Sequence, residues 1–279
     1  MIPTPTLVVR GQKVDLTEPV LMGIVNATPD SFSDGGLYTT AAACVDRAGE
    51  LIEAGAAIID VGGQSGITGV AEVPIDEEIS RVTPVVQGLR RAWPDLVVSV
   101  DAYRPEVVEA VLDAGAGIVN DISGLLYPEI AGLCADVGAG LVLMHTRAAP
   151  KVKLLDPRLY EPGTVTDDVV EFLESRLADV SARGVAAEAT IVDPGPDFAK
   201  TPHQTVQVLR DIDRVRALGR PVLLALSRKD FIGAITGKPP RERLAGTLAA
   251  VGHLAGPGSI LRVHDVDAVA QYLELASRR

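Results

Sequence analysis

Aromatic residues are scarce in this chain, and so are cysteines. Only 4% of the 279 residues are Phe, Trp or Tyr, whereas 47% are hydrophobic in total. A core rich in Ala, Val, Leu, Ile and Gly favours a globular protein of helices and strands with small-residue packing. Cys44 and Cys134 lie in apolar helical patterns without CxxC or Cys/His spacing. They indicate reduced core thiols, as expected in the cytoplasm.

An excess of positive charge and long apolar runs are also missing. The formal net charge of −11 argues against nucleic acid as a partner, because binding there depends on Lys and Arg neutralising phosphates. No stretch reaches the roughly 18 apolar residues of a membrane span. Residues 1–12 lack the basic start and apolar core of a signal peptide. We therefore expect a soluble cytoplasmic protein with neither a nucleic-acid nor a membrane partner.

Short apolar runs alternate along the chain with longer segments of helical period. The runs are continuous rather than alternating in polarity, as expected for parallel strands buried on both faces. The eight expected strands are residues 20–28, 57–63, 96–102, 117–123, 140–146, 190–195, 221–227 and 260–265. Eight strand–helix pairs in about 250 residues predict a (β/α)8 TIM barrel. A doubly wound sheet is the alternative, but it gives no reason to stop at eight.

Local signals support this organisation. Residues 40–56 and 165–184 have helical patterns, and the second has acids in its first turn and Arg183-Gly184 at its end, which suit the helix dipole and a C-cap. Residues 7–16 predict a β-hairpin around Gly11-Gln12 that covers the barrel bottom. We expect a single domain, residues 1–279, with residues 1–18 as an N-terminal hairpin extension.

Polar side chains end seven of the eight predicted strands. In a TIM barrel these ends converge on one site. The set comprises Asn26, Asp101, Asn120 with Asp121, His145, Asp193, Lys229, and Arg262 with His264. Helix capping or pairing with a nearby loop explains any single member, but seven together favour a shared site. The exception is the second strand, which ends in Gly62-Gly63-Gln64.

The chemistry of this set suits a ligand with two unlike ends. The chain has no GxSxG motif and no Ser-His-Asp order for covalent catalysis, and its histidines lack zinc-ligand spacing. Arg262, His264 and an Asn26-bound Mg²⁺ suit an anion such as pyrophosphate. Asp101, Asn120 and Asp193 suit a flat heterocycle with several N–H groups, and Asp101 can stabilise positive charge when an anion departs.

Several motifs give the chain a family resemblance. They are GIVNATPDSFSDGG (23–36), AIIDVGG (57–63), SVDAYR (99–104), IVNDISG (118–124), DPGPDFAKT (193–201), SRKDFIG (227–233) and RVHD (262–265). In this order, over nearly the whole chain, they resemble the dihydropteroate synthase family. The resemblance implies a transferase of folate biosynthesis that condenses 6-hydroxymethyl-7,8-dihydropterin pyrophosphate with p-aminobenzoate. It also implies Mg²⁺, a homodimer formed through the late barrel helices, and a sulfonamide target.

The resemblance also implies roles for individual residues. Asp101, Asn120, Asp193 and Lys229 would hold the pterin, Arg262 and His264 the leaving anion, and Asn26 the Mg²⁺. Phe198, Ser227 and Lys229 would border the aminobenzoate pocket. Within this set, Asp101, Lys229, Arg262 and His264 would be the catalytic residues. Residues 28–36 would form a mobile loop over the pyrophosphate.

The chain departs from the family pattern in three loops. Where the family usually continues Gly-Gly with Glu-Ser-Thr-Arg-Pro, residues 64–68 read Gln-Ser-Gly-Ile-Thr. Losing one charge-assisted contact costs roughly 1.5–3 kcal/mol. Residues 145–157 and Pro196-Asp197 differ as well. Besides a working synthase, the sequence therefore leaves open a non-catalytic or altered-specificity pterin-binding paralogue, and a methyltetrahydrofolate-dependent methyltransferase barrel.

Overall fold

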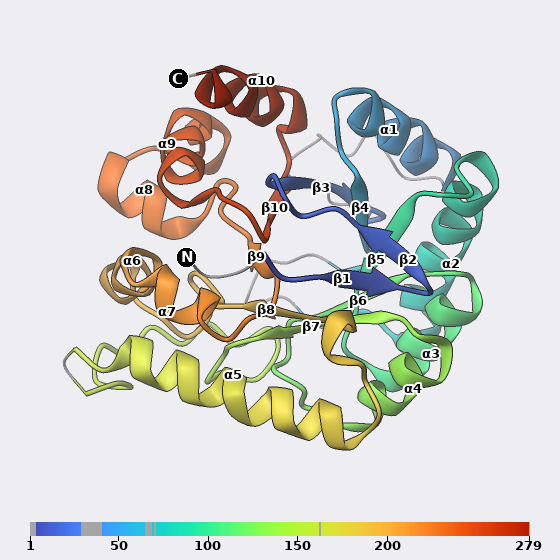
Figure 1. Ribbon diagram of the computed structural model, residues 1–279, viewed down its shortest axis with the longest axis horizontal. Helices are drawn as coiled ribbons and strands as arrows, with labels where there is room; N and C mark the ends of the chain where they lie inside the picture. Colours follow the sequence, from blue (N-terminus) through green and yellow to red (C-terminus); the bar gives the residue numbers. More distant parts are fainter. Residues whose placement is uncertain (1–3, 29–40, 65–68, 70, 162, 279) are drawn as a thin grey trace.

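Eight parallel strands close into a barrel in the computed structural model, which describes residues 4–28, 41–64, 69, 71–161 and 163–278. The strand order around the barrel is β10-β3-β4-β5-β6-β7-β8-β9 (Figure 1). The strands are β3 (Val20–Asn26), β4 (Ile58–Gly62), β5 (Val97–Asp101), β6 (Ile118–Asp121), β7 (Gly140–Met144), β8 (Thr190–Asp193), β9 (Val222–Leu224) and β10 (Ser259–Val263). The TIM barrel predicted from the sequence is confirmed, and each strand overlaps its predicted range.

Helices surround the barrel and cover the outer faces of its strands (Figure 1). They are α1 (Ala41–Glu53), α2 (Ile75–Ala92), α3 (Pro105–Asp113), α4 (Glu129–Val137), α5 (Val165–Ala182), α6 (Pro202–Arg210), α7 (Ile212–Arg216), α8 (Asp230–Thr236), α9 (Leu244–Leu254) and α10 (Val266–Ser277). Two short 3₁₀ turns, η1 (Ala187–Ala189) and η2 (Pro240–Glu242), lie between them. No helix in these described parts has the length and apolar character needed to span a bilayer.

A two-stranded hairpin precedes the barrel, as predicted. It pairs β1 (Leu7–Val9) with β2 (Gln12–Val14), and its turn places Arg10 and Gly11 at positive φ, 49° and 77°. Leu7 and Val9 are buried against the apolar interior of the barrel. The Arg10 guanidinium donates to two carbonyls at and just beyond the end of α3, at 2.6 and 2.8 Å. The hairpin therefore closes the N-terminal end of the barrel.

The interior is apolar at this closed end. Each barrel strand contributes one buried side chain to a cluster with the hairpin: Met22, Ile58, Val97, Ile118, Val142, Ile191, Leu223 and Ile260. Because side chains alternate along a strand, the residue two positions later faces the same interior, one layer closer to the C-terminal strand ends. On five of the eight strands that residue is polar, namely Asp60, Ser99, Asn120, Asp193 or Arg262. The alternation thus places a polar layer directly above an apolar one.

Candidate active site

Asp60 is the centre of the polar layer. Its carboxylate is completely buried and accepts three hydrogen bonds from side chains. Oδ1 accepts from Ser99 at 2.6 Å, and Oδ2 accepts from Asn120 at 3.2 Å and from the Arg262 Nε at 2.6 Å. Three donors, one of them charged, offset the cost of burying this carboxylate. The sequence showed no charged residue at the end of β4. The strand nevertheless contributes Asp60 to the site, two residues before its last residue, Gly62.

The contact with Asp60 fixes the orientation of the Asn120 amide. An ionised carboxylate only accepts hydrogen bonds, so the Asn120 group facing Asp60 is the Nδ2 donor. The Oδ1 atom of Asn120 is buried and has no hydrogen-bond partner within the described residues. A buried carbonyl oxygen without a donor is costly. The site thus presents an acceptor suited to an N–H group of a ligand.

Arg262 joins two carboxylates. While Nε contacts Asp60, Nη2 donates to Asp101 Oδ2 at 3.1 Å. Burial raises the pKa of the Asp101 carboxyl to about 7; the nearby Arg262 opposes this shift and Asp60 adds to it. A guanidinium has five N–H donors. The remaining donors of Arg262, including both on Nη1, can therefore face an anion without breaking either ion pair.

The C-terminal strand ends surround the open end of the barrel, which we call the mouth. Asp193 lies at the end of β8 and Lys229 follows β9, opposite Asp60 and Asp101 on β4 and β5. Asp193 is buried, and its Oδ1 accepts from the Gly195 amide at 2.7 Å. Burial raises the pKa of Asp193, against that hydrogen bond and the charge of Lys229. Lys229 Nζ donates to the Pro196 carbonyl at 3.0 Å and lies 4.5 Å from the centre of the Phe198 ring. This cation–π contact brings Lys229 and Phe198, both predicted site residues, together.

Ser227 and His264 form a pair across 37 residues of sequence. The Ser227 hydroxyl lies 2.9 Å from His264 Nδ1 and accepts from the His264 backbone N–H at 3.3 Å. Burial, together with the charges of Arg228 and Arg262, lowers the pKa of His264 to about 3, so its ring is neutral at physiological pH. We assign the tautomer in which the Ser227 hydroxyl, which accepts from the His264 backbone N–H, donates its own proton to Nδ1. His264 therefore carries its proton on Nε2, which leaves that atom as a hydrogen-bond donor.

Arg228 follows Ser227 and Asp265 follows His264, and these two neighbours contact each other at a turn with an unfavourable backbone conformation. Arg228, between Ser227 and Lys229, has a φ of 60° in the left-handed region. Its guanidinium makes two hydrogen bonds to Asp265, at 2.7 and 3.1 Å, and its N–H donates to Thr247 Oγ1. These contacts stabilise a backbone conformation that is otherwise unfavourable. The last residue of the RVHD motif thus braces the turn rather than contacting the mouth.

Asn26, the predicted magnesium ligand, ends β3 beside Gly62 of β4. A Cβ atom placed on Gly62 would lie 3.5 Å from Asn26 Oδ1 and 3.9 Å from Asp101 Cβ. The Asn26 amide and Asp101 therefore approach each other across the glycine. Among the described residues no group of three His, Cys, Asp or Glu side chains could hold a metal ion.

Two polar residues of the strand-end set do not face this mouth. Asp121 uses its carboxylate to accept from the backbone N–H groups of Ser123 and Leu125, at 2.7 and 3.0 Å, and so braces the turn after β6. His145 is fully buried, and its ring lies edge-on to Phe172 of α5 at 5.0 Å. The expectation that His145 shares the mouth was wrong. The sequence predicted both residues to lie at strand ends, but it did not determine whether each side chain points into the barrel or away from it.

Two of the three unusual loops have a structural explanation. Gln64 Nε2 donates to Glu78 Oε2 at 2.9 Å, and Glu78 also pairs with Arg104. A glutamate at position 64 would place two carboxylates in contact, so the neutral amide suits this chain. Asp197 Oδ2 accepts from the N–H groups of Asp230 and Phe231 at the start of α8, at 2.6 and 3.3 Å. Residues 65–68 and the predicted mobile loop, apart from Thr28, lie outside the described residues.

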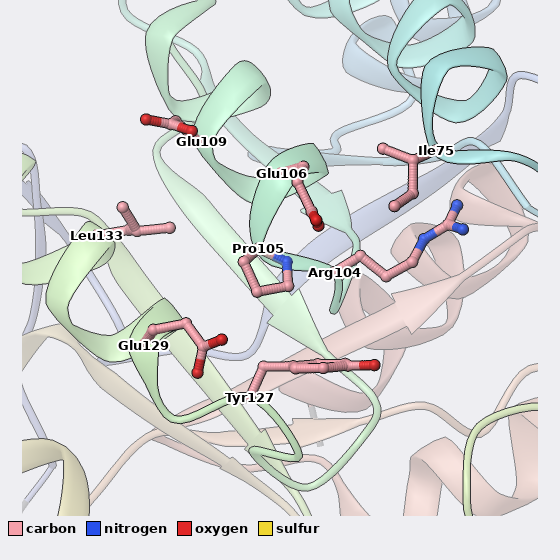
Figure 2. A pocket seen from close by; sticks show the side chains of 8 residues that line it. All are labelled: Ile75, Arg104, Pro105, Glu106, Glu109, Tyr127, Glu129 and Leu133. Atoms are coloured by element: carbon pink, nitrogen blue, oxygen red, sulfur yellow. The ribbon is translucent and has the colours of Figure 1, made fainter.

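A separate cleft of about 410 Å³ lies outside the barrel, between α3 and α4 (Figure 2). Figure 2 shows Glu106, Glu129 and Tyr127 around it, beside the Arg104 side chain. Glu109 also lines the cleft. Three glutamates would repel a pyrophosphate group, and Arg104 is already paired with Glu78. The lining includes no residue of the predicted site, so the cleft does not fit the substrate chemistry of the barrel mouth.

Comparison with known proteins agrees with this geometry. Residues 22–264 match the family described as pterin binding enzymes. That span covers most of the chain and includes the polar layer from Asn26 to His264. The chain therefore belongs to the family of pterin-binding enzymes.

Its relatives within this family are dihydropteroate synthases. The one from Synechocystis sp. is 40% identical over 92% of this chain and 88% of its own length. A structure of the Xanthomonas albilineans enzyme with 4-aminobenzoic acid has a TM-score of 0.88 at 38% identity, covering 99% of this chain and 98% of that one. The same enzyme in complex with 7,8-dihydropteroate has a TM-score of 0.85 at 39% identity, with 98% of both chains covered.

Proposed function

We propose that this chain acts as a dihydropteroate synthase, with the residue roles assigned below. It condenses 6-hydroxymethyl-7,8-dihydropterin pyrophosphate with p-aminobenzoate, and releases dihydropteroate and pyrophosphate. The observation that carries the assignment of roles is the polar layer, in which Asp60 holds Asn120 and Arg262 in fixed orientations. Relatives with 4-aminobenzoic acid or 7,8-dihydropteroate bound at high structural similarity support the same substrates here.

Asp193 and Asn120 hold the pterin ring. An amino-pyrimidinone edge presents parallel N–H donors, which need acceptors in a dry pocket. Asn120 Oδ1 is such an acceptor, unpartnered among the described residues, and Asp193 keeps Oδ2 available while Oδ1 binds the Gly195 amide. Both side chains are buried, so their hydrogen bonds to a ligand avoid competition from water. This combination supports recognition of a flat heterocycle rather than of a sugar or peptide.

Arg262 and His264 hold the leaving pyrophosphate. The remaining guanidinium donors of Arg262 and the Nε2–H of His264 stabilise the negative charge that appears as the C–O bond breaks. The bonding electron pair leaves with pyrophosphate, and the pterin methylene becomes a cation. Asp101, when ionised, stabilises that cation. The aminobenzoate nitrogen then forms the new C–N bond and loses a proton to solvent, so no enzyme nucleophile is needed.

Mg²⁺ fits this scheme through Asn26. Mg²⁺ commonly binds one or two protein oxygens and takes its other ligands from phosphates and water. The single amide oxygen of Asn26, beside Asp101 across Gly62, matches that limited demand. When bound, the ion would neutralise charge on the pyrophosphate.

Phe198, Lys229 and Ser227 form the aminobenzoate side. The Phe198 ring offers an apolar face for an arene, and Lys229 lies against that ring with a charge suited to a carboxylate. Ser227 acts through His264, whose tautomer it fixes. Competition by sulfonamides for this subsite stays a prediction.

Complementation of a strain that lacks dihydropteroate synthase tests the function. We expect growth without added folate products, and dihydropteroate formation by the purified protein from both substrates. Asp193→Asn is the matched variant: one acceptor becomes a donor that faces a ligand N–H, and calorimetry should show pterin binding weakened roughly 10- to 100-fold. Soluble wild-type protein that fails in both assays but binds pterin would favour the non-catalytic or altered-specificity paralogue.

The assembly follows from the same proposal. A single domain, a cytoplasmic location and a homodimer stay predictions for this chain. The homodimer follows from the family resemblance, which places the contact between two copies at the late barrel helices. Light scattering of the purified protein, which would give twice the chain mass, tests the dimer.

A further inference from the structure

Lys200 is a fully buried lysine that the scheme above does not use. It precedes α6 in the loop after β8, and only 1% of its surface is exposed. Its Nζ lies 2.7 Å from His145 Nδ1 and donates to the carbonyls of Gly195 and Phe198 at 3.0 and 3.1 Å. The His145 carbonyl oxygen lies 3.4 Å from the same Nζ, so four neutral acceptors surround a group that has three N–H donors when protonated. Among the described residues no carboxylate pairs with Lys200 directly. The lysine thus serves the loop as an internal hydrogen-bond donor, and burial lowers its pKa to about 7.

The partner of Lys200 is held in one tautomer. His145 accepts the lysine proton on Nδ1, so its own proton is on Nε2, which lies 2.8 Å from Asp168 Oδ2. Arg147 also pairs with Asp168. Burial and the charge of Lys200 lower the pKa of His145 to about 4, so the ring stays a neutral acceptor. A continuous hydrogen-bonded series therefore runs from α5 through β7 to the loop after β8.

The loop needs such support. Gly195, Asp197 and Ala199 all have φ values in the left-handed region, 64°, 66° and 50°. A Cβ on Gly195 would lie 2.0 Å from the His145 carbonyl oxygen, so the backbone is packed tightly here. Non-glycine residues adopt such angles only where surrounding contacts hold them. Lys200 supplies these contacts at Gly195 and Phe198, on both sides of Asp197.

The opposite side of the same loop carries the proposed aminobenzoate site. Pro196 accepts from Lys229, the Phe198 ring lies under the Lys229 ammonium, and Asp197 binds the first N–H groups of α8. Movement of this loop would therefore displace both Phe198 and Lys229. Of the two proposed pterin acceptors, Asn120 belongs to β6 and is held by Asp60, whereas Asp193 ends β8 and touches the loop through the Gly195 amide.

We propose that Lys200 is a positioning residue for the second substrate: through the Gly195 and Phe198 carbonyls it fixes the wall formed by Phe198 and Lys229, and His145 orients it. The proposal rests on the proposed function for the identity of that substrate. It predicts a larger defect for aminobenzoate than for the pterin, because Phe198 and Lys229 form the wall itself whereas Asn120 lies on β6 and Asp193 contacts the loop only through the Gly195 amide.

Kinetics of Lys200→Met test this, with Lys238→Met, an exposed lysine paired with Glu242, as the matched control. We expect the KM for p-aminobenzoate to rise roughly 10- to 100-fold, since small misplacements of binding groups have effects of that size. The affinity for pterin should change less than about threefold, a difference of well under 1.4 kcal/mol. An unchanged KM for p-aminobenzoate, or an equal loss for both substrates, would overturn the proposal.

A pair of variants at His145 separates positioning from general packing and serves even where Lys200→Met does not fold. Both remove the ring. His145→Asn retains an acceptor close to the Nδ1 position but loses the link to Asp168, whereas His145→Gln retains a donor close to Nε2 and loses the acceptor for Lys200. We expect His145→Gln to raise the KM for p-aminobenzoate more than His145→Asn does. The reverse order would contradict the role of Lys200.

Amide hydrogen exchange gives a readout that does not depend on turnover. In Lys200→Met or His145→Gln, exchange should accelerate at Gly195, Asp197 and Phe198 while the barrel strands keep their protection. Acceleration throughout the barrel, or none in this loop, would refute the proposal. Absence of turnover in the wild type would instead count against the proposed function, and the exchange result would still decide the role of Lys200.

Discussion

The two interior layers of the barrel are built from the same strands but have opposite chemistry. Ile58, Ile118, Ile191 and Ile260 belong to the apolar layer against the hairpin, and two residues further along each strand stand Asp60, Asn120, Asp193 and Arg262. The apolar layer, which is the lower one, is stabilised by burial without directional contacts. The polar layer, which is the upper one, is held by hydrogen bonds and ion pairs, and among the described residues it leaves the Asn120 Oδ1 acceptor unpaired. Stability and ligand recognition are thus divided between neighbouring layers.

Replacing Arg262 in the polar layer should lower kcat/KM more than any other substitution considered. Arg262→Met leaves the Asp60 and Asp101 carboxylates without their shared cation and removes a donor to the leaving anion. We expect kcat/KM to fall about 1000-fold or more, as for loss of a preorganised charge-stabilising donor. Initial rates measure this, with Arg91→Met on the exposed side of α2 as the control. A loss below about tenfold would remove Arg262 from the proposed role.

Asp60→Asn tests whether the upper layer also contributes to stability. The substitution replaces a buried carboxylate that pairs with Arg262 by a neutral amide, so we expect the free energy of unfolding to fall by about 3 kcal/mol. Ser99→Ala removes one hydrogen bond to the same carboxylate and should cost about 1 kcal/mol. Urea unfolding measures both. Equal effects would mean that the ion pair adds nothing beyond a neutral hydrogen bond.

Much of this organisation could be predicted from the sequence, and the exceptions have physical causes. Continuous apolar runs predicted the positions of the strands. The polar residues at strand ends predicted four residues of the site, Asn26, Asp101, Asn120 and Asp193. Asp60 was missed because it lies inside an apolar run rather than at its end; a lone acid in a buried strand was the available signal.

Contacts made by the tertiary fold could not be predicted in this way. The pairing of Ser227 with His264 joins two different strand–helix loops, and no local pattern encodes it. The burial of Lys200 depends on the loop after β8 folding back over β7. His145 was misplaced because a residue just after a strand can point to either side of it. Strand-end reasoning identifies the rim of a barrel, but it does not determine the direction of each side chain.

The pH dependence of catalysis should distinguish Asp101 from the buried histidines. Burial raises the pKa of Asp101 to about 7, whereas His264 and His145 have pKa values of about 3 and about 4 and stay neutral. The ionised fraction of Asp101 therefore rises about tenfold between about pH 6 and pH 8. We expect the ratio of kcat/KM in the wild type to that in Asp101→Asn to rise with pH over this range.

The ratio cancels the titrating groups on which Asp101 has no direct electrostatic effect. Lys200, whose pKa burial lowers to about 7, loses its charge in the same range, and the pyrophosphate of the substrate titrates independently of the variant. A ratio that stays flat with pH would show that the Asp101 charge does not matter for the reaction.

The smallest effect is expected in the lower layer. Ile118 lies two residues before Asn120 on β6, is fully buried and contacts the hairpin-facing cluster. Ile118→Val removes one methyl group and should lower the free energy of unfolding by about 1 kcal/mol. We expect kcat/KM to change less than about twofold, because the substitution leaves the hydrogen bond between Asn120 and Asp60 in place. Urea unfolding and initial rates on the same preparation give both values. A rate loss of about tenfold or more would mean that the two layers are mechanically coupled, so that the position of Asn120 depends on the packing below it as well as on Asp60 beside it.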